Sequence, residues 1–493
     1  MKSVLSYYCR LTHNGMSSSR ANPASKANKI KFIGIFCHFL PKNLLKMHTW
    51  LFCATFLPRC HLLGSHIMLI EFSVANFRSF KERQTLSLTK ANGQELSDTN
   101  TFRVEADHAL DLLKSTAIYG PNAGGKTNLL LAVRTMKDIV LHSANKQHGD
   151  ALPVNAFRLD NGLQHRPSEL EILFIAAGVR YQYGFTATQQ QVYEEWLIAY
   201  PNKRPQRWFS RAWNETRNEY DWEFGSHLTG TKQLWQKSTR DNALFLSTAV
   251  QLNSQQLQPL YDWFKNTLKT GQVGGWGVEF SALRCTSDDK SRILDFLKAA
   301  DLGIADIHVE TKPFDPNELP SDMPELIKDQ ITKAMKGEKV LEVKTLHQTN
   351  DGALIPFDLE DESDGTQRFF GFAGPWLDVL KNGYILFIDE LHDNLHPKLV
   401  QFLVQLFHNE TTNPHNAQLI FTTHETSILN QDVFRRDQIW FCEKDKSQAS
   451  NLYSLTDFSP RKGRENLELA YLSGRYGALP LVGSLSYPVN QNN

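Results

Sequence analysis

The octapeptide GPNAGGKT at residues 120–127 is the feature that most restricts how this chain can fold. It follows a short β-type run, STAIY at residues 115–119, and precedes residues 126–141, in which apolar side chains recur at helical spacing. The order strand, glycine turn, helix is the context that the pattern G-x-x-x-x-G-K-[ST] requires. The sequence therefore predicts an α/β fold whose glycine turn binds phosphate groups. The alternative is a plain glycine turn.

We expect the whole turn to hold a nucleoside triphosphate, and it consists of Gly120, Pro121, Asn122, Ala123, Gly124, Gly125, Lys126 and Thr127. Glycines let the backbone approach phosphate oxygens, and N–H groups at the start of the helix face the negative charge. Lys126 is expected to neutralise the β and γ phosphates as a catalytic residue, and the Thr127 hydroxyl to bind Mg²⁺.

A second motif supplies the acidic partner that such a turn needs. In YILFIDE, residues 384–390, an apolar run typical of a strand buried on both faces ends in Asp389 and Glu390. We expect Asp389 to hold the Mg²⁺ shell and Glu390 to polarise the attacking water. Two carboxylates in an exposed loop at a strand end are the alternative.

A histidine follows the next apolar strand. In FTTHE, residues 421–425, His424 comes after the run at 418–422. A group there is suited to sensing the γ phosphate and donating to it and to the attacking water. The competing interpretation is a structural histidine.

Five motifs in order give a resemblance to a known family: NFRSF at 76–80, GPNAGGKT at 120–127, ESDGTQR at 362–368, FIDELHDNLHP at 387–397 and FTTHE at 421–425. Together they resemble the RecF/SMC-like branch of ABC-type ATPases over residues 68–480. They are also similar to standalone prokaryotic AAA-type ATP-binding proteins of the abortive-infection and RloA-like phage-defence kind.

The resemblance implies an ABC-type ATPase head that works as an ATP-sandwiched homodimer or higher oligomer. It implies that SDGTQR stands in for the family's signature motif, so that Ser363 and Gly365 contact the γ phosphate bound to the opposite subunit. Asp364 and Thr366 replace glycines of transporter-type signatures. The alternative is a polar turn that caps a helix.

After a leader at residues 1–67, the motifs divide the chain into four parts. We expect an ATPase N-lobe with the phosphate loop at 68–165, an inserted β and helical region at 166–345, and a C-lobe with signature, Walker B and switch His at 346–445. A C-terminal tail follows at 446–493. Within these parts, residues 167–225 predict antiparallel strands, residues 230–340 are mainly helical in pattern, and FCEKD at 441–445 predicts a surface hairpin.

Residues 1–67 stand apart because they contain nine Lys or Arg and no Asp or Glu. Three interpretations remain: a targeting peptide, a membrane anchor, or upstream sequence read from an early start codon, which we favour with no stable fold. The whole chain has 53 basic and 53 acidic residues, so the rest carries an excess of nine acids. This excess argues against nonspecific DNA coating but leaves a local basic groove possible.

Only Cys285 and Cys442 lie outside this leader, which predicts a reducing, cytoplasmic location with no membrane contact. With ATP and Mg²⁺ as cofactors, the leading hypothesis is an ATP-driven switch. It controls a separate nuclease or toxin effector, because too few residues follow His424 for a nuclease domain of the Toprim kind. The alternatives are a RecF-like DNA-repair clamp and an ATP-bound scaffold without turnover, and GTP remains possible in place of ATP.

Overall fold

The computed structural model describes residues 67–106, 109–271, 276–319, 323–337, 339–461, 463 and 465–480. The predicted leader lies outside the described residues except for Ile67. Two large sheets form the body, and a three-stranded and a two-stranded sheet are attached to it. No helix among the described residues is long and apolar enough to span a bilayer.

The central sheet has the strand order β11-β15-β16-β5-β17-β18. The first five strands are parallel, and β18 pairs antiparallel at the edge. This sheet confirms the predicted α/β P-loop fold. The strands are β5 (Ser115–Tyr119), β11 (Leu268–Thr270), β15 (Ile385–Ile388), β16 (Gln418–Thr422), β17 (Ile439–Lys444) and β18 (Ser450–Ser454).

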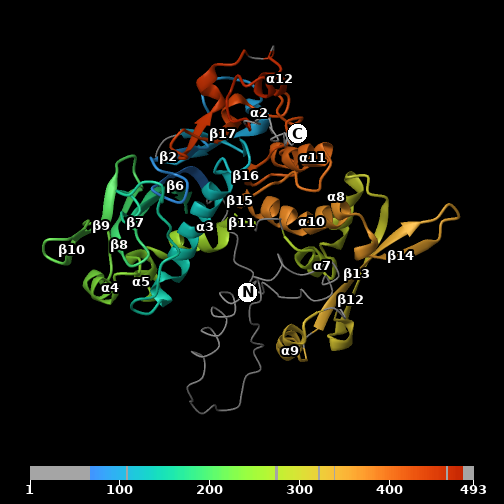
Figure 1. Ribbon diagram of the computed structural model, residues 1–493, viewed down its shortest axis with the longest axis horizontal. Coiled ribbons are helices and arrows are strands. Elements are labelled where there is room, and N and C mark those ends of the chain that lie inside the picture. Colours follow the sequence, from blue (N-terminus) through green and yellow to red (C-terminus); the bar gives the residue numbers. More distant parts are fainter. Residues whose placement is uncertain are drawn as a thin grey trace, which may run out of the picture.

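Both faces of the central sheet are buried, so every residue of β5, β15 and β16 is buried, and β15 and β16 have near-continuous apolar runs. Alternate residues of these strands enter two hydrophobic cores. One core contains helix α3 (Lys126–His142), and the other contains α10 (Asp364–Asn382) and α11 (Pro397–His408). Figure 1 shows α3 on one side of β15 and β16 and α10 on the other.

A seven-stranded antiparallel sheet packs with α3 in the first core, in the order β10-β9-β8-β7-β6-β1-β2. The antiparallel strands predicted for residues 167–225 are confirmed. They continue from β1, so the predicted boundary at residue 165 falls within one sheet and one core. The strands are β1 (Met68–Ala75), β2 (Gln84–Ser87), β6 (Ser168–Ala176), β7 (Val179–Ala187), β8 (Val192–Tyr200), β9 (Gln206–Asn214) and β10 (Glu219–Phe224).

Short helices follow this sheet. They are α4 (Lys232–Ser238), α5 (Phe245–Gln251), α6 (Gln258–Asp262), the π-helical turn η3 (Trp263–Thr267), α7 (Glu279–Cys285), α8 (Lys290–Ala299) and α9 (Glu325–Ala334). Other small elements include α2 (Ser97–Asn100), β3 (Thr101–Glu105), β4 (Ala109–Leu113) and α12 (Leu467–Leu472), together with several single-turn 3-10 helices. The helical pattern predicted from 230 onward is thus largely present.

The prediction of a mainly helical region up to residue 340 missed the first strand of a three-stranded sheet, which continues beyond that region. Its strands are β12 (Ile304–Pro313), β13 (Lys339–Gln348) and β14 (Leu354–Asp358). Most of β12 and all of β14 are partly or fully exposed, so these strands lack the regular apolar alternation by which a strand is recognised.

A buried ion pair joins the antiparallel sheet to α5. The side chains of Glu195 on β8 and Arg211 on β9 are both fully buried, with 3.1 Å between Oε2 and Nε. Glu195 also accepts hydrogen bonds from the backbone N–H of Phe245 at 2.7 Å and of Leu246 at 3.0 Å. The carboxylate therefore fixes the start of α5 against the sheet.

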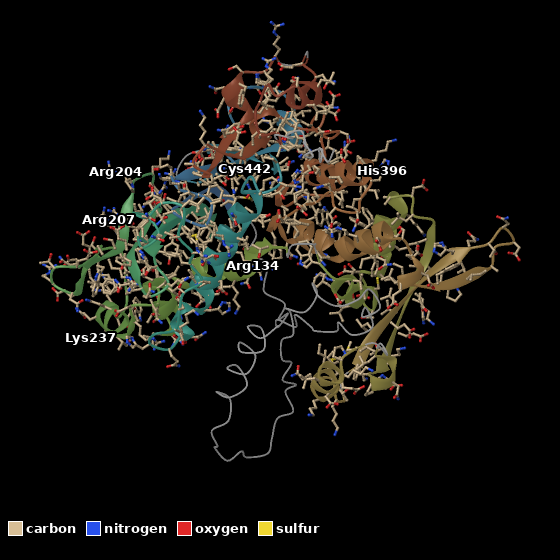
Figure 2. The ribbon with its side chains drawn as sticks, viewed as in Figure 1. Arg134, Arg204, Arg207, Lys237, His396 and Cys442 are labelled. Atoms are coloured by element: carbon tan, nitrogen blue, oxygen red, sulfur yellow. The ribbon has the colours of Figure 1, made fainter. Side chains whose placement is uncertain are left out.

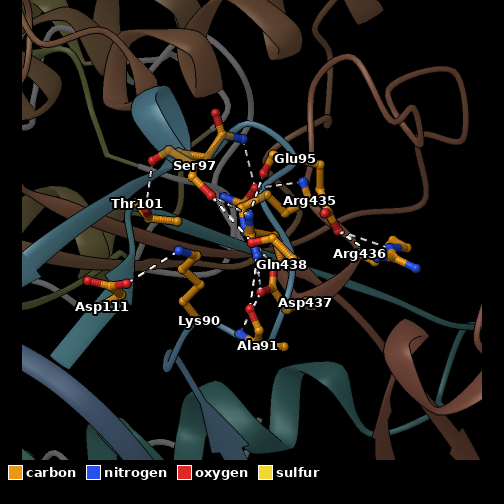
Figure 3. Close-up of polar contacts among 12 residues, drawn as sticks. Lys90, Ala91, Glu95, Ser97, Thr101, Asp111, Arg435, Arg436, Asp437 and Gln438 are labelled. Carbon is orange, nitrogen blue, oxygen red and sulfur yellow. Dashed lines mark hydrogen bonds and ion pairs between the residues drawn. The ribbon is translucent and has the colours of Figure 1, made fainter. Parts of the chain in front are cut away.

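A second buried network places β17 beside β5 (Figure 3). The fully buried Arg435 pairs with Asp437 and donates to the Ala91 carbonyl, while Ala91 N–H donates to Asp437 Oδ2 at 2.8 Å. Gln438 then donates through Nε2 to the Ser115 carbonyl at 3.0 Å, at the start of β5. The network thus connects the 91–97 segment, the turn before β17 and the strand that carries the phosphate loop.

Candidate functional site

The phosphate loop leaves the carboxyl end of β5 in a conformation that requires glycine. Gly120 has φ +150° and Gly125 has φ +118°, a region that L side chains rarely adopt. A Cβ on Gly120 would lie 2.0 Å from the backbone oxygen of Cys442, and one on Gly124 would lie 2.6 Å from it. The loop is therefore packed directly against β17.

This packing corrects the prediction of a surface hairpin at FCEKD. Strand β17 does form a hairpin with β18, but Phe441 and Cys442 are buried inside the central sheet. Figure 2 shows Cys442 near the middle of the molecule. The sequence prediction was wrong because acidic residues that follow an apolar pair do not show whether the strand lies at an edge or in the interior of a sheet.

Two serines support the loop, and sequence analysis assigned neither of them a role. Ser450 on β18 donates to the Gly124 carbonyl at 2.7 Å, and its Oγ lies 2.8 Å from Ser79 Oγ. Asn128 on α3 donates to the same Ser79 oxygen at 2.8 Å. Ser79 belongs to the NFRSF motif, so the motif was a usable signal for it. Ser450 carries no local signal, because its contacts are with residues more than three hundred positions away.

Lys126 is buried at the start of α3, with 6% of its surface exposed. Its Nζ lies 2.8 Å from the Gly120 carbonyl, 3.1 Å from the Pro121 carbonyl and 3.1 Å from His424 Nε2. Burial lowers the pKa of the ammonium, and the negative charges of Asp389 and Glu390 oppose that shift. A buried cation held only by neutral groups is well placed to receive phosphate oxygens.

The Mg²⁺ ligands predicted from sequence lie together. Thr127 Oγ1 donates to Asp389 Oδ2 at 2.7 Å, and the Thr422 hydroxyl donates to Asp389 Oδ1. The described residues contain no cluster of three metal-binding side chains. Mg²⁺ does not need one, because it is usually bound through one or two carboxylates and the substrate's phosphates. The oxygen pair of Thr127 and Asp389 fits this chemistry.

Glu390 follows Asp389 in a left-handed backbone conformation, with φ +51°. Its N–H donates to Thr422 Oγ1 at 2.8 Å, and its carbonyl accepts from Asp393 N–H at 3.0 Å and from Arg368 Nη2 at 3.4 Å. Such strained residues concentrate at functional sites and persist where neighbours hold them. The side chain is partly exposed, so water reaches the carboxylate.

His424 completes this group. Burial, followed by the charge of Lys126, lowers the pKa of its imidazole to about 4. A lysine ammonium only donates hydrogen bonds, so Nε2 is the acceptor and the ring proton of the neutral imidazole lies on Nδ1. The ring of His392 lies 5.5 Å away, edge to face. The structure thus brings together Lys126, Thr127, Asp389, Glu390 and His424.

The predicted signature residues have other contacts within the described chain. Ser363 is exposed, and its hydroxyl caps α10 by accepting from Thr366 N–H at 3.1 Å. A Cβ on Gly365 would lie 2.9 Å from the Asn394 carbonyl. His396 caps α11 in the same manner, accepting from Lys398 N–H at 3.2 Å, and Figure 2 shows it near α11. The signature turn and the loop after Glu390 therefore lie against each other.

Comparison with known families identifies this arrangement. Residues 115–430 match the model of the family described as "AAA domain, putative AbiEii toxin, Type IV TA system". The chain belongs to this family. The matched range runs from β5 beyond His424, so it includes the phosphate loop, Ser363, Gly365, Asp389, Glu390 and His424. The resemblance inferred from the motifs is confirmed at the level of an ABC-type P-loop ATPase.

Solved structures similar to this family member include the SMC head domain from Thermotoga maritima, with 12% identity, TM-score 0.36, and 78% of this chain and 98% of that chain covered. An Smc head derived from Pyrococcus furiosus, bound to the C-terminal domain of ScpA, has 10% identity, TM-score 0.36, and 79% and 96% covered. The recombination mediator RecF in its "RecF-ATPrS" structure has 13% identity, TM-score 0.32, and 79% and 98% covered. No curated protein matched the chain.

Proposed function

We propose that the protein binds and hydrolyses ATP and uses the cycle as a molecular switch. One observation carries this proposal: Asp389 accepts from both Thr127 and Thr422, and the backbone N–H of Glu390 donates to the same Thr422 hydroxyl, so the two acidic residues are held at the edge of the sheet that carries the phosphate loop. A scaffold that only holds nucleotide does not need a strained, water-accessible glutamate at this position.

Each residue has a defined task in hydrolysis. The loop N–H groups and the Lys126 ammonium hold the phosphates, and Glu390 orients water and accepts its proton. His424, neutral at physiological pH, donates from its ring N–H toward the developing charge and the attacking water. Thr127 and Asp389 would hold Mg²⁺, which would supply neutralisation of phosphate charge when bound.

A second subunit supplies the other half of the site in this proposal. Ser363 and Gly365 lie at the N-terminus of α10, a 19-residue helix, where backbone N–H groups and the helix dipole favour an anion. Ser363 is exposed and so is available to a neighbouring molecule. ATP would then close a homodimer, and hydrolysis would open it.

The output of the switch is proposed to be a separate effector, a nuclease or toxin, in phage defence. The family description, which names a toxin and a toxin–antitoxin system, supports this context. A RecF-like DNA clamp is the second candidate, supported by the same motifs. The excess of nine acidic residues outside the leader weighs against it.

The test compares the full-length wild type with Glu390→Gln and with Glu105→Gln, a matched change at an exposed, distant glutamate. We expect the wild type and Glu105→Gln to hydrolyse ATP. Glu390→Gln should lose turnover at least about a hundredfold and accumulate an ATP- and Mg²⁺-dependent dimer, measured by light scattering. Nucleotide binding with neither turnover nor a change of mass in the wild type would support the scaffold instead.

Duplex DNA separates the switch from the clamp. A clamp should show DNA-stimulated hydrolysis, with DNA binding that weakens about a thousandfold or more between 50 and 200 mM salt. We expect turnover by the switch to be insensitive to DNA at both salt concentrations.

A further inference from the structure

Strand β14 carries an exposed apolar surface at the tip of an arm made of β12, α9, β13 and β14. All five residues of β14 are exposed, and 49% of Leu354, 46% of Ile355 and 43% of Phe357 is accessible. β14 is an edge strand, and within the described residues it pairs with β13 alone. Figure 1 shows this hairpin projecting away from the body.

β14 is a short edge strand that carries large exposed apolar side chains. Short length, charged residues and proline protect an edge against strand addition, whereas large exposed apolar side chains gathered on one element mark interaction sites. Pro356 lacks an N–H and interrupts the donors on this strand. Docking is therefore expected through the side chains of β14, rather than by addition of a fully paired strand.

The acidic residues around β14 indicate which class of molecule can bind there. Between residues 349 and 367 the chain has no Lys or Arg and six carboxylates, contributed by Asp351, Asp358, Glu360, Asp361, Glu362 and Asp364. This charge repels the phosphates of nucleic acid. It also opposes pairing with the same strand of a second copy, because like charges placed together across an interface cost several kcal/mol.

We propose that β14 is the docking surface for a separate protein, which presents an extended apolar segment flanked by Lys or Arg residues. The segment covers the edge of β14 and contacts Leu354 on one face of the strand and Ile355 and Phe357 on the other. The carboxylates at both ends of the strand pair with the flanking bases. The partner is thus distinct from both DNA and the second ATPase subunit.

The arm is connected to the predicted signature motif. The ring of Phe357 on β14 packs edge to face on His347, with 5.0 Å between centroids. His347 Nε2 lies 2.6 Å from Glu362 Oε1, which also accepts from Thr345 Oγ1 at 2.5 Å. Glu362 directly precedes Ser363. A partner on β14 therefore acts on the start of α10; this coupling rests on the proposed function, whereas the docking itself does not.

The experiment selects binders of the full-length protein from a displayed library of random dodecapeptides. The variants are the double change Leu354→Ser and Ile355→Ser, the double change Asp358→Asn and Asp361→Asn, and the control Leu234→Ser, which alters an exposed leucine on α4. All four altered side chains in the arm are exposed, so unchanged thermal melting is expected. Lys126→Ala is included to separate docking from ATP binding.

We expect selection to enrich apolar sequences flanked by Lys or Arg. Their affinity should fall at least tenfold in the Leu354/Ile355 variant, lose much of its salt dependence in the Asp358/Asp361 variant, and be unchanged in the control. Binding should persist in Lys126→Ala, so a failure of the ATPase proposal would leave this result intact. Binding of the peptides selected on the wild-type protein should change the rate of ATP turnover in the wild type and leave that rate unchanged in Glu362→Gln.

Three outcomes would overturn the proposal. The first is that the selected peptides lack flanking Lys or Arg residues, or that they bind the Leu354/Ile355 variant as tightly as the wild type. The second is self-association that the Leu354/Ile355 variant abolishes, which would make a second copy the occupant. The third is carbodiimide cross-linking, within a monomer, of the arm carboxylates to lysines of residues 1–66.

Discussion

At the scale of single residues, the imidazole of His424 lies against the ammonium of Lys126, and its pKa is lowered to about 4. An unfolded histidine titrates near 6.5. As the pH falls, the unfolded chain therefore binds the proton before the folded chain does. The contribution of His424 to the free energy of unfolding is complete above about pH 6.5 and is lost as the pH falls toward 4.

We expect nuclear magnetic resonance to give a His424 titration midpoint near pH 4. The loss of stability between pH 7 and 5, measured by urea unfolding, should be smaller in His424→Gln. His142→Gln, a change at an exposed histidine, is the matched substitution and controls for the loss of an imidazole. A midpoint above 6 would contradict the neutral imidazole described here.

Arg368 gives a second residue-scale prediction. It contacts the Glu390 carbonyl and pairs with Asp393, with 3.3 Å between Nη1 and Oδ2. We expect Arg368→Ala to lower kcat for ATP about tenfold or more, with little change in KM, because a small displacement of Glu390 misplaces the water without disturbing the phosphate loop. Arg368→Lys should recover part of the rate. The exposed Arg103→Ala is the control, and an increase in KM alone would refute the positioning role.

Much of the site could be predicted because its chemistry is encoded locally. The loop at 120–127, the pair Asp389 and Glu390, and His424 each follow an apolar strand in a short motif, and parallel strands bring their carboxyl ends to one edge. Arg368 had a motif but no assigned role. Ser450 had neither, since its importance comes from a hairpin packed against Gly124.

At the scale of secondary-structure elements, the ion pair of Glu195 and Arg211 joins β8, β9 and α5. We expect Glu195→Gln to destabilise the fold by about 3–5 kcal/mol, because it leaves the buried guanidinium without its counter-charge. Urea unfolding measures this change. Glu223→Gln, at an exposed pair with Arg207, is the matched control and should have little effect. Equal effects of the two changes would show that burial of the pair is unimportant.

Secondary-structure elements were predictable from the sequence in the part of the fold where the central sheet is covered on both faces. β16 was predicted at its observed bounds, and α3 within a residue, because strong apolar patterns begin and end sharply there. β12 to β14 were not recognised, because little of their surface is buried. Exposed positions accept polar residues on both faces, so these strands lack the alternation of apolar and polar residues that identifies a strand.

At the scale of the whole molecule, nucleotide binding should stabilise the fold, because the site joins α3 to β15 and β16. At a concentration of ATP one hundred times Kd, with Mg²⁺, we expect about 2.7 kcal/mol of added stability. Calorimetry should show the gain in the wild type and in Glu390→Gln but not in Lys126→Ala. A gain retained by Lys126→Ala would mean that the nucleotide binds elsewhere.

The order of strands in the central sheet also has a consequence for synthesis on the ribosome. β5 is made early, yet its neighbours β16 and β17 come from the last quarter of the chain, and Lys126 meets His424 across 298 residues. Pairing over such a separation is slow and leaves an apolar strand without its neighbours until translation nears its end. The candidate site is therefore incomplete while most of the chain is being made, and a chain that stops before β16 lacks His424.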